Sequence, residues 1–102
     1  MELVRMKNLA EIQKTIKNLK MELEKVYHVN NIGIFGSFAH GEADAASDID
    51  ILVEFSESVG FFHFLELEEF LENRLGRKVD LVTKKALKPY IGKKILEEVI
   101  MV

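Results

Sequence analysis

Apolar residues recur at helical spacing in two long stretches of the chain and again near its end. The first stretch has an apolar stripe at steps of three and four residues, which predicts an amphipathic helix with lysines on its solvated face. The stripe consists of Leu9, Ile12, Ile16, Leu19 and Leu23. Asn8 followed by Glu11 is a capping pattern that marks the start of this helix. A second helix is predicted over residues 61–75, where the broad stripe suggests a well-buried helix, and Gly76 closes it. A last helix is predicted to begin at Pro89.

Three short apolar runs between these helices predict β-strands over residues 32–35, 49–55 and 78–83. A short helical turn is expected after Ser37, and the apolar end of the chain, residues 100–102, predicts a terminal strand or an interface. The order helix, strand, short helix, strand, helix, strand, helix predicts an α/β fold, a small domain in which a mixed sheet carries helices.

Length and composition narrow the functional classes. The 102 residues predict one domain spanning residues 1–102, and 48% apolar with 30% charged residues is an ordinary balance for a globular protein. A net charge of −3 lacks the basic footprint of a general nucleic-acid binder, and the absence of cysteine excludes disulfides, zinc–thiolate sites and thiol catalysis. No apolar stretch approaches membrane-spanning length and the N-terminus is not a signal peptide, so we expect a cytoplasmic location.

Candidate chemistry is concentrated between residues 36 and 55, which read GSFAHGEADAASDIDILVEF. Asp48 and Asp50 are two residues apart at the start of a strand, so their carboxylates point to the same face and repel each other. A divalent cation with oxygen ligands, most often Mg²⁺ holding a phosphate, relieves that repulsion. Gly36 lets a backbone approach a ligand and Ser37 offers a hydroxyl and an N–H, so this turn is a candidate phosphate site. Taken alone, such a pair of aspartates is more often a solvated turn, and Gly-Ser is often a plain turn.

The segment resembles the nucleotidyltransferase superfamily that includes DNA polymerase beta and kanamycin nucleotidyltransferase. The signature of that superfamily is Gly-Ser, ten residues, then Asp-x-Asp, and Gly36-Ser37, residues 38–47 and Asp48-Ile49-Asp50 fit it without a gap. In its short length and in the segment SDIDILVEF, the chain most resembles the minimal nucleotidyltransferases, the MNT proteins. These proteins are often antitoxin partners of HEPN-domain toxins. The resemblance covers nearly the whole chain.

This resemblance implies Mg²⁺-dependent transfer of AMP from ATP to a hydroxyl, specifically a tyrosine of a HEPN toxin. It implies that Asp48 and Asp50 bind the metal and that Asp80 on the next predicted strand is the third carboxylate, as a metal ligand or as the base that handles the acceptor. Without the resemblance, Asp80 also fits a solvent-exposed face at the edge of the sheet. Glu54 is expected to be a polar residue at the far end of its strand and not a metal ligand.

Two further nucleotide-binding candidates are His40 and Ser47. His40 stands where these families usually carry arginine, and it offers one bond to phosphate where arginine offers two. An exposed loop histidine explains it equally well.

Three alternatives to protein AMPylation stay open. The chain could neutralise its partner by binding alone. It could modify a small molecule, with a second copy of the chain forming the missing wall of the substrate site. It could also carry these residues by coincidence. The acceptor, the preferred base and the oligomeric state, whether homodimer or hetero-oligomer, are not specified by the sequence.

Overall fold

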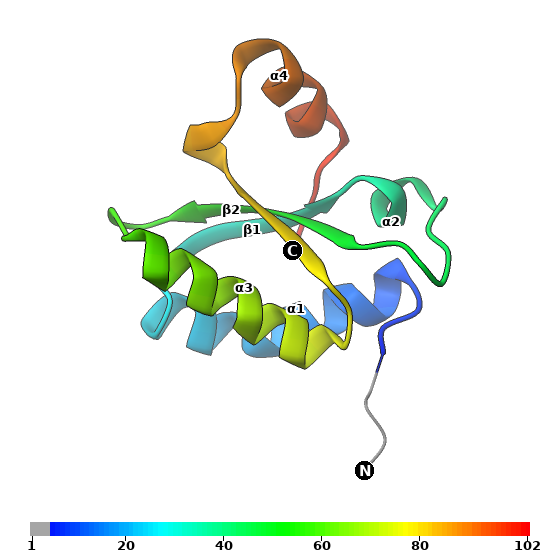
Figure 1. Cartoon of the computed structure of the whole chain (residues 1–102), viewed down its shortest axis with the longest axis horizontal. Helices are drawn as coiled ribbons and strands as arrows, with labels where there is room; N and C mark the ends of the chain where they lie inside the picture. Colours follow the sequence, from blue (N-terminus) through cyan, green and yellow to red (C-terminus); the bar gives the residue numbers. More distant parts are fainter. Residues whose placement is uncertain (1–4) are drawn as a thin grey trace.

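The computed structural model describes residues 5–102 (Figure 1). Along the chain these residues form nine elements. They are α1 (Leu9–Lys25), β1 (Val29–Phe35), α2 (Ser37–His40), β2 (Ile49–Phe55), α3 (Phe61–Leu75), β3 (Val79–Thr83), the 3₁₀ turn η1 (Lys84–Ala86), α4 (Pro89–Glu98) and β4 (Ile100–Met101). The predicted α/β fold is confirmed, and β2 has the bounds expected from its alternating pattern. No helix within residues 5–102 is long and apolar enough to cross a membrane.

The four strands form one mixed sheet in the order β3-β2-β1-β4. β1 is antiparallel to both β2 and β4, whereas β2 and β3 are parallel. Figure 1 shows α1 and α3 side by side under one face of this sheet, with α4 over the opposite face. The main core lies between the sheet and the first pair of helices. Its fully buried members include Ile12, Ile16, Leu23, Ile34, Ile49, Ile51, Val53, Leu67, Leu71 and Leu75.

Local signals explain where the two long helices begin and end. The N–H of Glu11 donates to Oδ1 of Asn8 at 2.9 Å, and the Glu11 carboxylate accepts from the N–H of Lys7 at 2.9 Å. These bonds satisfy backbone donors that the first turn leaves free, so the predicted cap is confirmed. Gly76 has φ +65° and ends α3 in the left-handed region, where a glycine is least strained.

Strand β1 starts earlier than expected, at Val29, so Asn30 and Asn31 belong to the strand and do not precede it. A bulge between Val29 and Asn31 adjusts the pairing with β2. The amide of Asn31 donates to Oε1 of Glu54 at 2.8 Å, so a polar residue in this strand has a cross-strand partner. Asparagine is common in turns, so its local pattern does not indicate a strand. The partner that holds Asn31 in the strand, Glu54, is distant in the sequence.

The expectation that α3 is well buried is wrong for its first turn. Phe61 and Phe62 are 69% and 78% exposed, whereas Leu67, Leu71 and Leu75 are fully buried. A helix packed on one face of a sheet buries only the side turned toward that sheet, so a broad apolar stripe cannot be covered throughout. Helix α4 behaves similarly, with Ile91 58% exposed. The predicted terminal strand is confirmed as β4, which pairs with β1 at Gly33 and Ile34.

Candidate active site

The pairing of the strands brings the two halves of the signature together. Phe35 at the end of β1 lies opposite Asp50 near the start of β2, so the turn at Gly36 reaches the aspartate segment directly. The contact is close, since a Cβ placed on Gly36 would lie 2.0 Å from Oδ2 of Asp50. Gly36 also has φ +73°, which favours glycine. Both features require a glycine here, one because of the backbone conformation and one because of the carboxylate.

Asp80, near the start of β3, lies next to Asp50 on the strand that neighbours β2. In the parallel pair β2/β3, Asp50 lies directly opposite Asp80. Side chains opposite each other on neighbouring strands lie close together on one face. The sheet therefore places Asp80 beside Asp50, as the resemblance implied, even though thirty residues of sequence separate them.

The electrostatics of this group are those of crowded anions. The pKa of Asp50 is raised to about 6, chiefly by burial and then by the charges of Asp80 and Asp48 and a hydrogen bond with Asp80. Asp50 is partly buried, whereas Asp48 and Asp80 are exposed. Ionisation of Asp50 therefore costs more than that of an exposed aspartate, and a nearby positive charge would reduce this cost.

The chemistry of these side chains fits a hard divalent cation. All three offer carboxylate oxygens, the ligands that Mg²⁺ prefers, and a cation there would remove the repulsion that raises the pKa of Asp50. Among residues 5–102, no three acidic, histidine or cysteine side chains are already gathered around a common point. The joint ligation of one ion by Asp48, Asp50 and Asp80 therefore stays a prediction.

The remaining nucleotide-binding candidates lie at the margin of this group. Ser37 is the first residue of α2, partly exposed, directly after the Gly36 turn. His40 is the last residue of α2, and its Nε2 is 3.1 Å from Oε2 of Glu98 on α4. In this structure His40 thus contacts α4, and its predicted role toward phosphate stays untested.

Ser47 has a local role. Its Oγ accepts from the N–H of Asp44 at 2.9 Å and donates to the Asp44 carboxylate at 3.3 Å, so it closes the turn that precedes Asp48. Its predicted contact with a nucleotide is likewise untested. Glu54 lies at the far end of β2, where Asn31 and Lys84 lower its pKa.

Sequence reasoning missed Arg77, which fixes the loop that carries Asp48. This arginine is 9% exposed and lies just before β3. Its guanidinium also lies 5.1 Å from the centre of the Phe38 ring on α2. Its hydrogen bonds all go to backbone carbonyl oxygens, namely those of Met6 (2.5 Å), Asp44 (3.3 Å), Ala45 (3.3 Å) and Ser47 (2.8 Å). Every residue has a carbonyl, so no side-chain pattern in the sequence marks this arginine as different from a solvated one.

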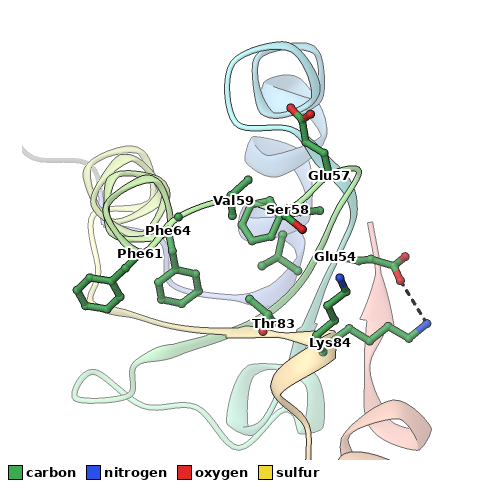
Figure 2. A pocket seen from close by; sticks show the side chains of 12 residues that line it. Glu54, Glu57, Ser58, Val59, Phe61, Phe64, Thr83 and Lys84 are labelled. Atoms are coloured by element: carbon green, nitrogen blue, oxygen red, sulfur yellow. Dashed lines mark ion pairs between the residues drawn. The ribbon is translucent and has the colours of Figure 1, made fainter.

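A cavity of about 430 Å³ lies elsewhere, at the opposite ends of β2 and β3 (Figure 2). Phe61 and Phe64 from α3 line one side of it, and Thr83 and Lys84 line the floor near the Glu54–Lys84 ion pair. None of the three aspartates lines this cavity. This cavity is therefore separate from the three aspartates. The candidate active site is the region around Gly36, Asp50 and Asp80, where β1 ends and β2 and β3 begin.

Comparisons with known proteins agree with this geometry. The family described as nucleotidyltransferase domain matches residues 12–102. The protein adenylyltransferase MntA of Thermococcus cleftensis is 47% identical over 97 residues, which cover 95% of this chain and 98% of that protein. A solved structure assigned to a minimal nucleotidyltransferase is 32% identical with a TM-score of 0.75, covering 88% of this chain and 92% of the other. A toxin–antitoxin structure, MntA–HpeT with a Y104A substitution, contains a chain that is 26% identical with a TM-score of 0.67, covering 88% of this chain and 69% of that one.

Proposed function

This chain belongs to the nucleotidyltransferase family, and we propose that it transfers AMP from ATP to a hydroxyl group of a protein. The observation that carries the proposal is the contact between the Gly36 turn and Asp50, with Asp80 opposite. That contact places a candidate phosphate-binding turn against a candidate metal-binding carboxylate, which phosphoryl and nucleotidyl transfer both need. The relative in Thermococcus cleftensis, named a protein adenylyltransferase, supports a protein as the acceptor.

Each residue of the site has a role in this proposal. Asp48 and Asp50 hold Mg²⁺, which when bound neutralises charge on the triphosphate. Ser37 and the backbone N–H groups that follow Gly36 bind phosphate oxygens. Asp80 accepts the proton of the acceptor hydroxyl, whose oxygen attacks the α-phosphorus as pyrophosphate leaves. Arg77 contributes indirectly, because it holds the loop before Asp48 in one conformation.

The acceptor that fits best is a tyrosine of a HEPN-domain toxin, which AMP attachment would silence. Two features support this choice: the likeness to the MNT proteins and the likeness to a chain of the MntA–HpeT toxin–antitoxin structure. The position of the site agrees with it, since Asp80 lies opposite Asp50 and is exposed, so that another protein can present a side chain there.

Intact-mass analysis tests the proposal. A candidate partner incubated with this protein, ATP and Mg²⁺ should gain the mass of AMP, and Asp48→Asn or Asp50→Asn should abolish the gain. Glu54→Gln is the matched control, because Glu54 lies on the same strand but beside Asn31 and Lys84, away from the site. Full transfer by either aspartate variant, or a loss in the control of equal size, would refute the assigned roles.

A second candidate function is neutralisation by binding alone. The observation that favours it is the contact of His40 with Glu98, which leaves this side chain engaged where related proteins use arginine. Titration of toxin activity against this protein separates the two functions. An enzyme should neutralise well below one copy per toxin and should need ATP, whereas a binder should need one copy per toxin with or without ATP.

A further inference from the structure

Lysines are concentrated on one short segment near the end of the chain. Residues 84–94 contain five lysines, and no acidic residue occurs from 84 to 96, in a chain whose net charge is −3. All five side chains are exposed. Only Lys84 has an ion pair among the described residues, with Glu54 at 3.7 Å. Such a concentration of one charge on an acidic protein attracts an oppositely charged partner more than it stabilises the fold.

The same segment contains a groove with apolar walls. We name it the cationic groove, and it has a volume of about 420 Å³. The residues that line it are Lys84, Leu87, Lys88, Pro89, Gly92, Lys93, Leu96 and Glu97, so three lysines and one carboxylate face it. Next to it, Tyr90 is 91% exposed and Ile91 is 58% exposed. Gly92 is the one fully buried residue of α4, and it packs against Leu87.

The position of α4 connects this groove to the candidate active site. Helix α4 lies over the face of the sheet opposite α1 and α3 (Figure 1). The side chains of Ile49 and Ile51 point into the core on the α1 and α3 side, so Asp50, which alternates with them along β2, points to the α4 side. The contact between His40 and Glu98 joins α4 to α2, the helix that follows the Gly36 turn. A protein held on α4 therefore lies on the same face as the carboxylates.

We propose that the cationic groove docks the protein acceptor through an acidic segment of that acceptor that also carries aliphatic side chains. The inference rests on the proposed function, because it assigns the recognition surface for the acceptor of that reaction. Lys88 and Lys93 are the principal contacts, because Lys84 is already paired. Leu87 and Leu96 receive the aliphatic side chains. Charged groups at such a rim steer the approach of the partner, while the apolar wall retains it.

Aliphatic walls favour a protein over a nucleic acid. Nucleic-acid sites of this kind combine lysines or arginines with aromatic rings on which bases stack. Here Tyr90 is the one aromatic side chain on the segment, and the side chains that flank the lysines are Leu87, Ile91 and Leu96. Binding of RNA is therefore an outcome that the experiment must exclude.

The test measures binding directly and requires no catalysis. The probe is a dye-labelled synthetic peptide of glutamate and leucine in helical periodicity, titrated by fluorescence anisotropy, with a single-stranded oligouridine RNA of similar charge as the competitor. The wild type should bind the peptide, and Lys88→Glu with Lys93→Glu should weaken binding about tenfold or more, since reversed charges repel. The matched control is Lys17→Glu with Lys20→Glu, the same charge change on exposed lysines of α1, which should leave the affinity unchanged.

Three outcomes would overturn the docking inference. They are equal weakening by the α1 control, preference for the RNA over the peptide, and loss of affinity for Mg²⁺ and a non-hydrolysable ATP analogue in the α4 variant. The last would assign the lysines to the nucleotide site. The proposed function fails separately, when Asp48→Asn still transfers AMP. With an acceptor in hand, the α4 variant should raise KM for the acceptor and leave KM for ATP unchanged.

Discussion

Replacing Asp50 by asparagine should make the metal-free protein more stable at neutral pH while removing its activity. In the folded protein the pKa of Asp50 rises from 3.8 to about 6, so the ionised form is destabilised by burial and by its two acidic neighbours. The folded state binds this proton more tightly than the unfolded state does. The penalty is therefore absent below pH about 4, appears as the pH rises through the interval between the two pKa values, and is complete above pH about 6.

The size of the effect follows from the same shift. At about 1.36 kcal/mol per pKa unit, the rise corresponds to at most about 3 kcal/mol. Because the carboxyl group is partly exposed, solvent screening reduces this to about 1–2 kcal/mol. A neutral asparagine of the same shape avoids the penalty, so Asp50→Asn should raise the free energy of unfolding by that amount. For a domain of this size the melting temperature should increase by at least about 4 °C.

Urea unfolding in EDTA at pH 8 and at pH 4 measures the effect, which should be present at the first pH and nearly absent at the second. Glu54→Gln is the control with the opposite expectation. The pKa of Glu54 is lowered by Asn31 and then by Lys84, so its charge is favourable and its removal should not stabilise the protein at pH 8. Mg²⁺ with a non-hydrolysable ATP analogue should stabilise the wild type and not Asp50→Asn. Lower stability of Asp50→Asn at pH 8 in EDTA would show that the acidic cluster is not strained and would refute the reasoning.

The remaining predictions concern the residues around the carboxylates. Gly36→Ala should lose far more nucleotide affinity than Gly41→Ala when binding is measured by calorimetry. Both glycines have positive φ, but only a Cβ on Gly36 meets a carboxylate. Equal losses of affinity would mean that backbone strain is the whole cause. Arg77→Ala should destabilise by about 2–4 kcal/mol in urea, because buried carbonyls lose their donor. Arg74→Ala, the exposed control on α3, should cost about 0.5 kcal/mol or less. His40→Arg should tighten binding of the ATP analogue if this position contacts phosphate, and unchanged affinity would make it a loop residue.

Much of the site could be predicted because its signals are local. A spacing of two residues predicts that Asp48 and Asp50 share one face; in the structure Asp50 lies on β2 and Asp48 directly precedes that strand. The third carboxylate was different, since Asp80 could be assigned only through the family resemblance. Its neighbour in space depends on which strands pair, and in the structure the register of β2 with β3 sets Asp80 opposite Asp50.

Local patterns in the chain were enough to predict the cap at Asn8, the bounds of β2, the end of α3 at Gly76 and the signature that contains the two aspartates. Caps and periodic stripes depend on neighbours a few residues away, so they can be recognised in one dimension. Other features depend on contacts between segments that are distant in the sequence. Arg77 is buried because carbonyls from distant segments surround it, and Phe61 is exposed because the sheet covers only one side of α3. Such outcomes depend on which surfaces meet, and a residue's own sequence neighbours do not contain that information.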